Sequence, residues 1–99
     1  MNQENMKTQN EENLVLMQFY AEWCQPCRMM MPVINRIQER NYFWLNIKQI
    51  DVDADSEIAN KFGIRSIPTF VVLKNNIEIW RKTGVISETE LLETLNSLA

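Results

Sequence analysis

The chain has 99 residues, of which 45% are hydrophobic and 23% charged, and its net charge is -3. This length suits one small domain with its own core, and the lack of a Lys/Arg cluster argues against nucleic acid or a membrane as partner. Because the sequence has no histidine and only two cysteines, Cys–His proteolysis and a four-ligand zinc site within one chain are excluded.

Residues 1–13 are polar and rich in Asn, Gln and Glu, which predicts a loose tail or a weakly formed extra element. They contain no apolar signal-peptide core, and we therefore expect a cytoplasmic protein. The ordered domain is expected to span residues 14–99. It opens with residues 14–20, which are almost continuously apolar, as in a strand that is buried on both faces of a parallel sheet.

A helix is predicted from residue 25 to residue 40, because apolar side chains recur there at helical spacing. Its buried stripe consists of Met30, Val33, Ile34 and Ile37. Pro26 falls in the first turn, where its missing N–H costs nothing, whereas Pro32 lies inside the helix and is expected to kink it. The run Met29-Met30-Met31 is typical of core-filling side chains plus one exposed residue, although methionines also form adaptable binding surfaces.

The middle of the chain predicts a second strand and a short helix. Residues 43–52 are dense in β-forming side chains and are expected to form a buried strand. Residues 56–62 predict a short helix, which ends at Gly63. Trp44, and Trp80 further along the chain, are expected to pack against the sheet.

The last third of the chain predicts a hairpin and a helix. Residues 69–73 and 77–82 read as strands, and the two adjacent Asn residues between them tolerate the positive φ of a tight turn. Ser87-Glu88-Thr89-Glu90 is a capping box that opens the final helix. With a right-handed first crossover, the order β-α-β-α-β-β-α gives two parallel strands and an antiparallel edge.

The chemistry is expected at Cys24 and Cys27, the only cysteines of the chain. If Cys24 caps the helix, the N–H of Cys27 points back at its sulfur, and the two sulfurs come within bonding reach. A thiolate on Cys24 is favoured there by the helix dipole and by unpaired N–H groups. A C-x-x-C near a βαβ pattern predicts dithiol–disulfide chemistry. Cys24 would attack a disulfide and Cys27 would resolve the mixed disulfide.

Four ordered motifs resemble the thioredoxin family. Residues 21–28, Ala-Glu-Trp-Cys-Gln-Pro-Cys-Arg, look like its active-site run, with Gln25 where thioredoxins usually have Gly. Residues 62–69 resemble its cis-proline loop, and Pro32 matches the proline of its active-site helix. Residues 74–76 and 83–84 match its hairpin and the glycine loop that follows. The resemblance covers residues 14–99 and implies an α/β thioredoxin fold. Its central mixed sheet would have about four strands, with room for a fifth at the N-terminus, and helices on both faces.

The resemblance also implies roles for residues around the dithiol. Pro68, if its peptide bond is cis, would face the dithiol, and the backbone of Ile67 would pair with an extended substrate segment. An apolar substrate surface would consist of Trp23, Ile67, Pro68, Gly84 and Val85, with Gln25 and Pro26 supporting the dithiol. Core packing of Trp23, a loop role for Pro68 and a turn role for Gly84 are the structural alternatives.

Gln18 and Gln49 depart from the family pattern. Counted back from Cys24, Gln18 stands where thioredoxins carry a buried aspartate, and Gln49 stands where they carry the partner lysine. Losing both charges together is coherent, since one unpaired buried charge is costly. We expect the two amides to hydrogen-bond to each other, and Cys27 to lose its proton without a carboxylate base. Gln25 is expected to change the reduction potential, because residues between the cysteines influence it.

These features together predict a thiol–disulfide oxidoreductase that reduces protein disulfides. No flavin or dinucleotide motif is present, so we expect no bound cofactor beyond the Cys24–Cys27 disulfide itself, and an external reductase as electron donor. The predicted partners are disulfide-containing proteins, and the protein is expected to be a monomer without nucleic-acid or membrane partners. A disulfide isomerase or oxidant, and a thioredoxin-like interaction module without catalysis, are the alternatives.

Overall fold

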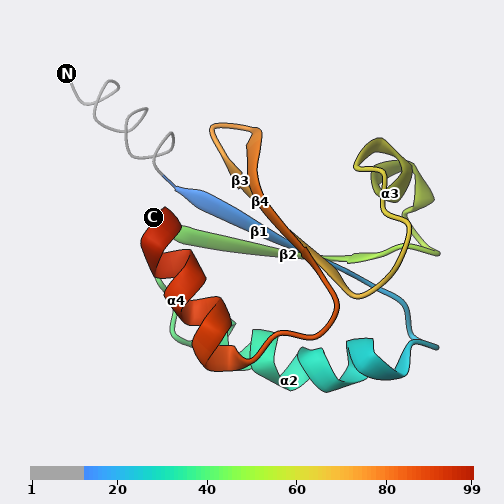
Figure 1. Ribbon diagram of the computed structural model, residues 1–99, viewed down its shortest axis with the longest axis horizontal. Coiled ribbons are helices and arrows are strands. Elements are labelled where there is room, and N and C mark those ends of the chain that lie inside the picture. The colour runs from blue at the N-terminus through green and yellow to red at the C-terminus, as the bar shows by residue number, and fades with distance from the viewer. Residues whose placement is uncertain (1–12) are drawn as a thin grey trace.

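The computed structural model describes residues 13–99, so that the element expected in residues 1–13, and with it a fifth strand, falls almost wholly outside the described part. Seven elements follow one another in the predicted order (Figure 1). They are β1 (Leu14–Tyr20), α2 (Gln25–Glu39), β2 (Leu45–Asp51), α3 (Ser56–Lys61), β3 (Thr69–Lys74), β4 (Ile77–Thr83) and α4 (Glu88–Leu98).

The four described strands form one mixed sheet in the order β2-β1-β3-β4. β1 and β2 are parallel, and their register places Gln18 opposite Gln49. β3 is antiparallel to both β1 and β4. Asn75 and Asn76 have φ values of 56° and 65° in the turn between β3 and β4, as the hairpin prediction requires. Parallel pairing of β1 with β2 brings the ends of these two strands to the same edge of the sheet, where the dithiol lies.

Helices cover both faces of this sheet, as Figure 1 shows with α2 and α4 below it and α3 on the other side. β1 contributes to both layers because its side chains alternate. Leu14 and Leu16 pack with α2 and α4, and Trp44 and Trp80 lie against this cluster as predicted. Met17 and Phe19 pack on the opposite face with the α3 side of the molecule. The nearly continuous apolar run of β1 thus reflects a strand that is buried on both faces.

The predicted start of β2 was wrong by two residues. Phe43 is 89% exposed, and the N–H of Leu45 donates to the Tyr42 carbonyl at 3.2 Å, so the chain turns before the strand begins. The Tyr42 and Trp44 rings stack with centroids 4.9 Å apart. Two of the three consecutive aromatic residues therefore pack ring on ring in the turn that precedes the strand.

Local caps and ion pairs fix the two long helices relative to each other. The Ser87 hydroxyl accepts from the Glu90 N–H at 3.1 Å, which confirms the predicted cap of α4. Arg36 of α2 donates to Glu88 at the start of α4 at 2.8 Å. α2 continues through Pro32 to Glu39 as a single helix. The ion pair therefore links the last turn of α2 to the first turn of α4.

Candidate active site

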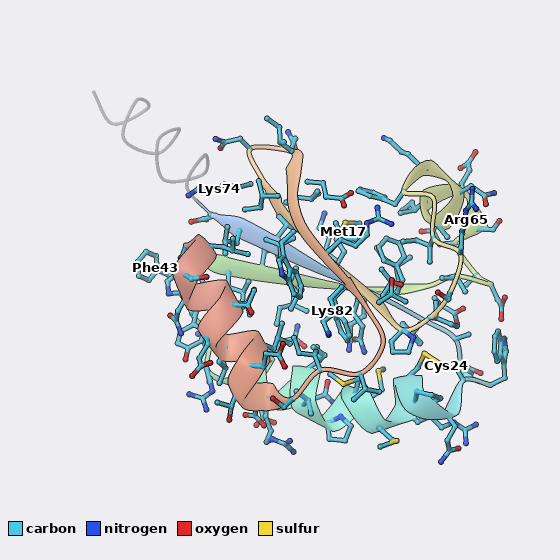
Figure 2. The ribbon with its side chains drawn as sticks, viewed as in Figure 1. Met17, Cys24, Phe43, Arg65, Lys74 and Lys82 are labelled. Atoms are coloured by element: carbon cyan, nitrogen blue, oxygen red, sulfur yellow. A yellow bond between two sulfur atoms is a disulfide. The ribbon has the colours of Figure 1, made fainter. Side chains whose placement is uncertain are left out.

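Cys24 is the N-cap of α2, as the sequence predicts. Its backbone is extended, with φ −89° and ψ 109°, and its sulfur accepts a hydrogen bond from the Cys27 N–H at 3.2 Å. Cys24 and Cys27 form a disulfide, with Cα atoms 5.2 Å apart. Figure 2 shows Cys24 at the N-terminal end of α2, far from Phe43 and Lys74 at the other end of the molecule. The strand-to-helix turn thus brings both sulfurs to one end of the domain.

The two cysteines lie in a small apolar cluster and differ slightly in exposure. Cys24 is 5% exposed and Cys27 1%, and both pack with Ala21. Val52 and Ile67 lie against this cluster. A low-polarity setting favours the uncharged disulfide, while the helix N-terminus favours a thiolate on Cys24 when the bond is open.

The loop before β3 lies next to Cys24. The Ile67–Pro68 peptide bond is cis, and the carbonyl oxygen of Ile67 lies 3.9 Å from Cys24 Sγ. The Gly84 N–H donates to the Pro68 carbonyl at 2.8 Å, and Gly84 has a φ of 104° that L-residues rarely adopt. The structure therefore brings Ile67, Pro68 and Gly84 together beside the dithiol.

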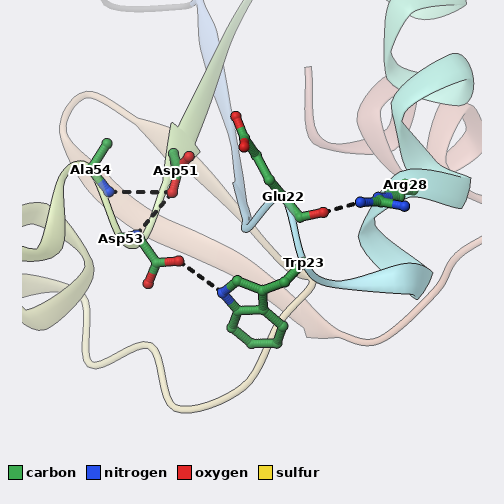
Figure 3. A pocket seen from close by; sticks show the side chains of 6 residues that line it. All are labelled: Glu22, Trp23, Arg28, Asp51, Asp53 and Ala54. Carbon is green, nitrogen blue, oxygen red and sulfur yellow. Dashed lines mark hydrogen bonds between the residues drawn. The ribbon is translucent and has the colours of Figure 1, made fainter.

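Trp23 is not a core residue, which removes the packing alternative for this side chain. It is 68% exposed, and its indole Nε1 donates to Asp53 Oδ2 at 2.8 Å (Figure 3). On the other side of the turn, Arg28 Nε donates to the Glu22 carbonyl at 2.9 Å. These bonds fix the turn that carries Cys24. They also border an open cavity of about 580 Å³, lined by Glu22, Trp23, Arg28, Asp51, Asp53 and Ala54.

Asp53 was not predicted from the sequence as part of this site. Its alternation with Asp51 and Asp55 suggests only an incomplete metal loop. The predicted topology could have indicated its position, because the residues that follow two parallel strands, here β1 and β2, lie at the same edge of the sheet. Trp23 follows β1 and Asp53 follows β2, which places an indole donor beside a carboxylate acceptor.

A neutral amide pair lies under α2, on the side of the sheet that carries the dithiol. Gln18 is fully buried, and its Oε1 accepts from Gln49 Nε2 at 3.0 Å, as predicted. Gln18 Nε2 donates to the sulfur of Met31 at 3.4 Å, and Gln49 Nε2 lies 3.8 Å from the same sulfur. Met31 was not predicted here, although it lies one helical turn after Cys27 and so shares its face of α2. The three side chains form a support without any ionisable group.

A second cavity lies beside Met31 and Cys27. Its volume is about 300 Å³, and it is lined by Tyr20, Ala21, Glu22, Cys27, Arg28 and Met31. The remaining predicted site residues lie at the surface. Gln25 and Pro26 are exposed in the first turn of α2, and Val85 is 50% exposed directly after Gly84.

Comparison with known proteins decides the family. The thioredoxin family model matches residues 2–97 of the chain. The chain is 39% identical to the thioredoxin of Rickettsia bellii over 83 residues, which cover 84% of this chain and 79% of that protein. It is 40% identical to a Listeria monocytogenes thioredoxin over 88 residues, covering 89% and 85% of the two chains. The chain belongs to the thioredoxin family.

The similarity extends to the three-dimensional structure. The X-ray structure of Fasciola hepatica thioredoxin superposes with a TM-score of 0.82 at 31% identity, covering 99% of this chain and 92% of that one. The predicted thioredoxin fold and the predicted redox motif are thus confirmed. Cys24 and Cys27 are the redox-active pair of a thiol–disulfide oxidoreductase, a family that binds no separate cofactor and implies protein disulfide substrates and a reductase. No helix within residues 13–99 is long and apolar enough to cross a membrane.

Proposed function

We propose that this thioredoxin reduces disulfides of protein substrates, with Cys24 as the attacking residue and Cys27 as the resolving residue. The Cys24 thiolate attacks one substrate sulfur and forms a mixed disulfide with it, and the other substrate sulfur leaves as a thiolate and takes up a proton. The Cys27 thiol then loses its proton and attacks Cys24 Sγ. This attack releases the substrate sulfur that was bonded to Cys24. Two electrons pass to the substrate, and the Cys24–Cys27 disulfide of the structure is the product state.

The position of Cys24 at the helix N-terminus is the single observation that carries this assignment. Its sulfur accepts the Cys27 N–H at 3.2 Å, a bond that stabilises a thiolate more than a thiol. Cys24 is also the more exposed of the two cysteines, at 5% against 1%. An incoming disulfide can therefore reach Cys24 before it can reach Cys27.

The surface in front of Cys24 supports binding of an extended segment of a protein substrate. Trp23, directly before Cys24, and Val85, directly after Gly84, expose large apolar side chains, and exposed apolar groups of this kind mark interaction sites. The backbone of Ile67 lies next to the dithiol, with its carbonyl oxygen 3.9 Å from Cys24 Sγ. We assign substrate contact to Trp23, Ile67, Pro68, Gly84 and Val85.

The neutral support behind the dithiol gives the resolving step its own character. Gln18 and Gln49 bind each other and Met31, and none of these groups takes up a proton near neutral pH. We therefore expect Cys27 to pass its proton to water or to Cys24 itself. The cavity beside Cys27 supplies the space for that water.

The partners follow from this chemistry. Each turnover leaves the disulfide, so an external reductase has to return two electrons to it. We propose that the protein acts as a monomer in the cytoplasm on disulfide-containing proteins. Residues 13–99 contain no dense Lys/Arg face of the kind that would favour nucleic acid, and the net charge is -3.

The test is the reduction potential of the dithiol together with turnover on a model disulfide protein. A reducing potential and turnover that disappears in Cys24→Ser support the proposal. A strongly oxidising potential would instead assign the protein as an oxidant or isomerase. Absence of turnover in a folded, reduced protein would assign it as an interaction module.

The effect of Gln25 on the reduction potential is measured in the same way by comparing Gln25→Gly with the wild type.

A further inference from the structure

The three consecutive methionines of α2 occupy three different environments. Met29 is 60% exposed and Met30 only 1% exposed, while Met31 is half-buried and lines the cavity beside Cys27. The prediction of core filler plus one exposed residue therefore describes Met30 and Met29. Met31 belongs to neither class, because its sulfur takes part in a polar network.

The polar partners of Met31 are unusual for a thioether. Two amide nitrogens face its sulfur, Gln18 Nε2 at 3.4 Å and Gln49 Nε2 at 3.8 Å. A thioether sulfur is a weak acceptor. Gln18 is fully buried, so this side of its amide is not exposed to bulk water. The Gln18 donor would be better satisfied by a strong acceptor than by the sulfur, and the Gln49 donor faces the same sulfur from an exposed residue.

The cavity gives small molecules a route to Met31, which lines it, while Gln18 and Gln49 lie outside its lining. At about 300 Å³ it is roughly ten times the volume that one water occupies in the liquid. Glu22 and Arg28 on its lining are exposed residues, so the cavity communicates with the surface. A molecule the size of hydrogen peroxide fits beside Met31.

We propose that Met31 is an oxidation site whose sulfoxide is accepted by the fold through Gln18 and Gln49. The sulfur attacks one oxygen of hydrogen peroxide, the O–O bond breaks, and the departing hydroxide takes the proton of the transferred oxygen to give water. The thioether is oxidised by two electrons and the peroxide is reduced by two electrons. The new sulfoxide oxygen accepts the amide N–H groups that already face the sulfur, one helical turn from Cys27.

This arrangement reverses the usual consequence of methionine oxidation. Oxidation commonly disrupts a core because a polar oxygen enters an apolar site. At Met31 the oxygen would meet donors instead, whereas at the buried Met30 it would meet the apolar cluster of α2 and α4. The prediction is therefore specific to one of three adjacent residues of the same type.

The experiment treats the disulfide form of the full chain with hydrogen peroxide, so that the cysteines are already protected. Peptide mapping by mass spectrometry then follows a gain of one oxygen at each methionine. Met29 serves as the exposed internal reference. Thermal unfolding is measured before and after oxidation for the wild type, Gln49→Ala and Met31→Leu. Because Met31→Leu carries every other sulfoxide, its shift is subtracted from the others.

The expected result is sulfoxide at Met31 and Met29 with Met30 unmodified, and almost no shift in Tm due to Met31 in the wild type. In Gln49→Ala the same oxidation should lower Tm by a further ~4–8 °C, since one donor to the sulfoxide is missing. Full oxidation of Met29 with Met31 untouched would overturn the proposal. An equal Tm shift in the wild type and Gln49→Ala would overturn it as well, because the amide would then play no part.

Discussion

The two sides of the Cys24–Cys27 disulfide differ in almost every physical respect. The front, where Trp23 and Val85 lie, is exposed, apolar and built from loops. The back is polar and is built from β1, β2 and α2, with Gln18 fully buried, Met31 half-buried and Gln49 at the surface. The front carries the motifs that the chain shares with thioredoxins. At the back, neutral amides stand where the family pattern has charged residues.

This difference separates two requirements of the same reaction. Attack on a substrate needs an accessible thiolate and a surface for the substrate, and the front supplies both. Resolution needs Cys27 to lose a proton in a buried place. The neutral side chains of Gln18, Gln49 and Met31 can orient groups there by hydrogen bonds, but they cannot accept the proton. Changes at the front should therefore affect exchange directly, while changes at the back should affect stability and pH dependence first.

The largest effect is expected at the front, from Cys24→Ser. Exchange with a protein disulfide should fall by about a thousand-fold or more, because the attacking thiolate is gone. Cys27→Ser should retain the first attack and accumulate a mixed disulfide with the substrate, which non-reducing electrophoresis detects. A trapped complex in Cys24→Ser and none in Cys27→Ser would reverse the two roles.

The next effect is expected at the back, from Gln18→Asp. A carboxylate at this fully buried position loses its hydration, so its pKa in the folded state should lie above that in the unfolded state. At low pH the protonated variant should show only the loss caused by its shorter side chain, and it should lose a further ~2–4 kcal/mol of unfolding free energy as the pH rises to neutrality. Urea unfolding at several pH values measures this loss.

Gln18→Asn is the matched control for that experiment, since it shortens the side chain equally without adding a charge. Its stability loss should be smaller and independent of pH. A loss of the same size in both variants at every pH would show that packing and not charge governs the back of the site. A large loss of exchange rate in Gln18→Asp would count against a base-free resolving step, which expects no change or a gain.

A smaller effect is expected at the front from Gly84→Ala. The added Cβ would meet no atom within 4 Å, but the φ of 104° is unfavourable for any L-residue. We expect a loss of about 1–2 kcal/mol in unfolding free energy from backbone strain alone. Denaturant unfolding measures it, and Val85→Ala, one residue on and exposed, should cost much less. A cost near zero for Gly84→Ala would mean that the loop changes its conformation.

The smallest effect is expected away from both sides, at the Glu78–Arg81 pair of β4. Hydrogen bonds from Arg81, with its charge, lower the pKa of the Glu78 carboxyl from 4.5. The pair therefore adds stability above that pH and loses it as the pH falls through the lowered pKa. Since the side chains are 34% and 36% exposed, the contribution should stay below about 1 kcal/mol.

Glu78→Gln tests this by acid unfolding. The unfolding free energy of the variant should differ slightly less between neutral and acid pH than that of the wild type. The rate of thiol–disulfide exchange should be unchanged. A marked effect on exchange would contradict the separation of this pair from the dithiol.

Much of the fold was predictable because the relevant signals are local. The apolar run of β1, the Asn-Asn turn and the Ser87 cap each specify one element by short-range physics. The Gln18–Gln49 bond was predicted from the resemblance to thioredoxins, which carry a charged pair at these two positions, and the parallel register places the two residues opposite each other. Phe43 was misassigned because its β propensity does not reveal that the neighbouring rings, Tyr42 and Trp44, stack in a turn.

The parts that escaped prediction depend on side chains that meet only in the folded molecule. Asp53 receives the Trp23 indole through a loop conformation that follows β2, which no local pattern specifies. Met31 shares a helix face with Cys27, but its contact with two amides depends on how α2 lies on the sheet. The sequence therefore identified the chemistry, while the structure was needed for the groups that surround it.

The pH dependence of single-turnover exchange, compared with the ultraviolet absorbance of the thiolates, tests the central claim most directly. With Gln18, Gln49 and Met31 behind the dithiol, the rate should follow the thiolate titration of Cys24 and Cys27 and show no other ionisation. Tyr20, Glu22 and Arg28 line the adjoining cavity, with Asp51 and Asp53 beyond it, so Glu22→Gln and Asp53→Asn should give the same curve. The account would be contradicted if the pH–rate curve showed a further ionisation that the thiolate absorbance does not show, and if this ionisation disappeared in Glu22→Gln or in Asp53→Asn.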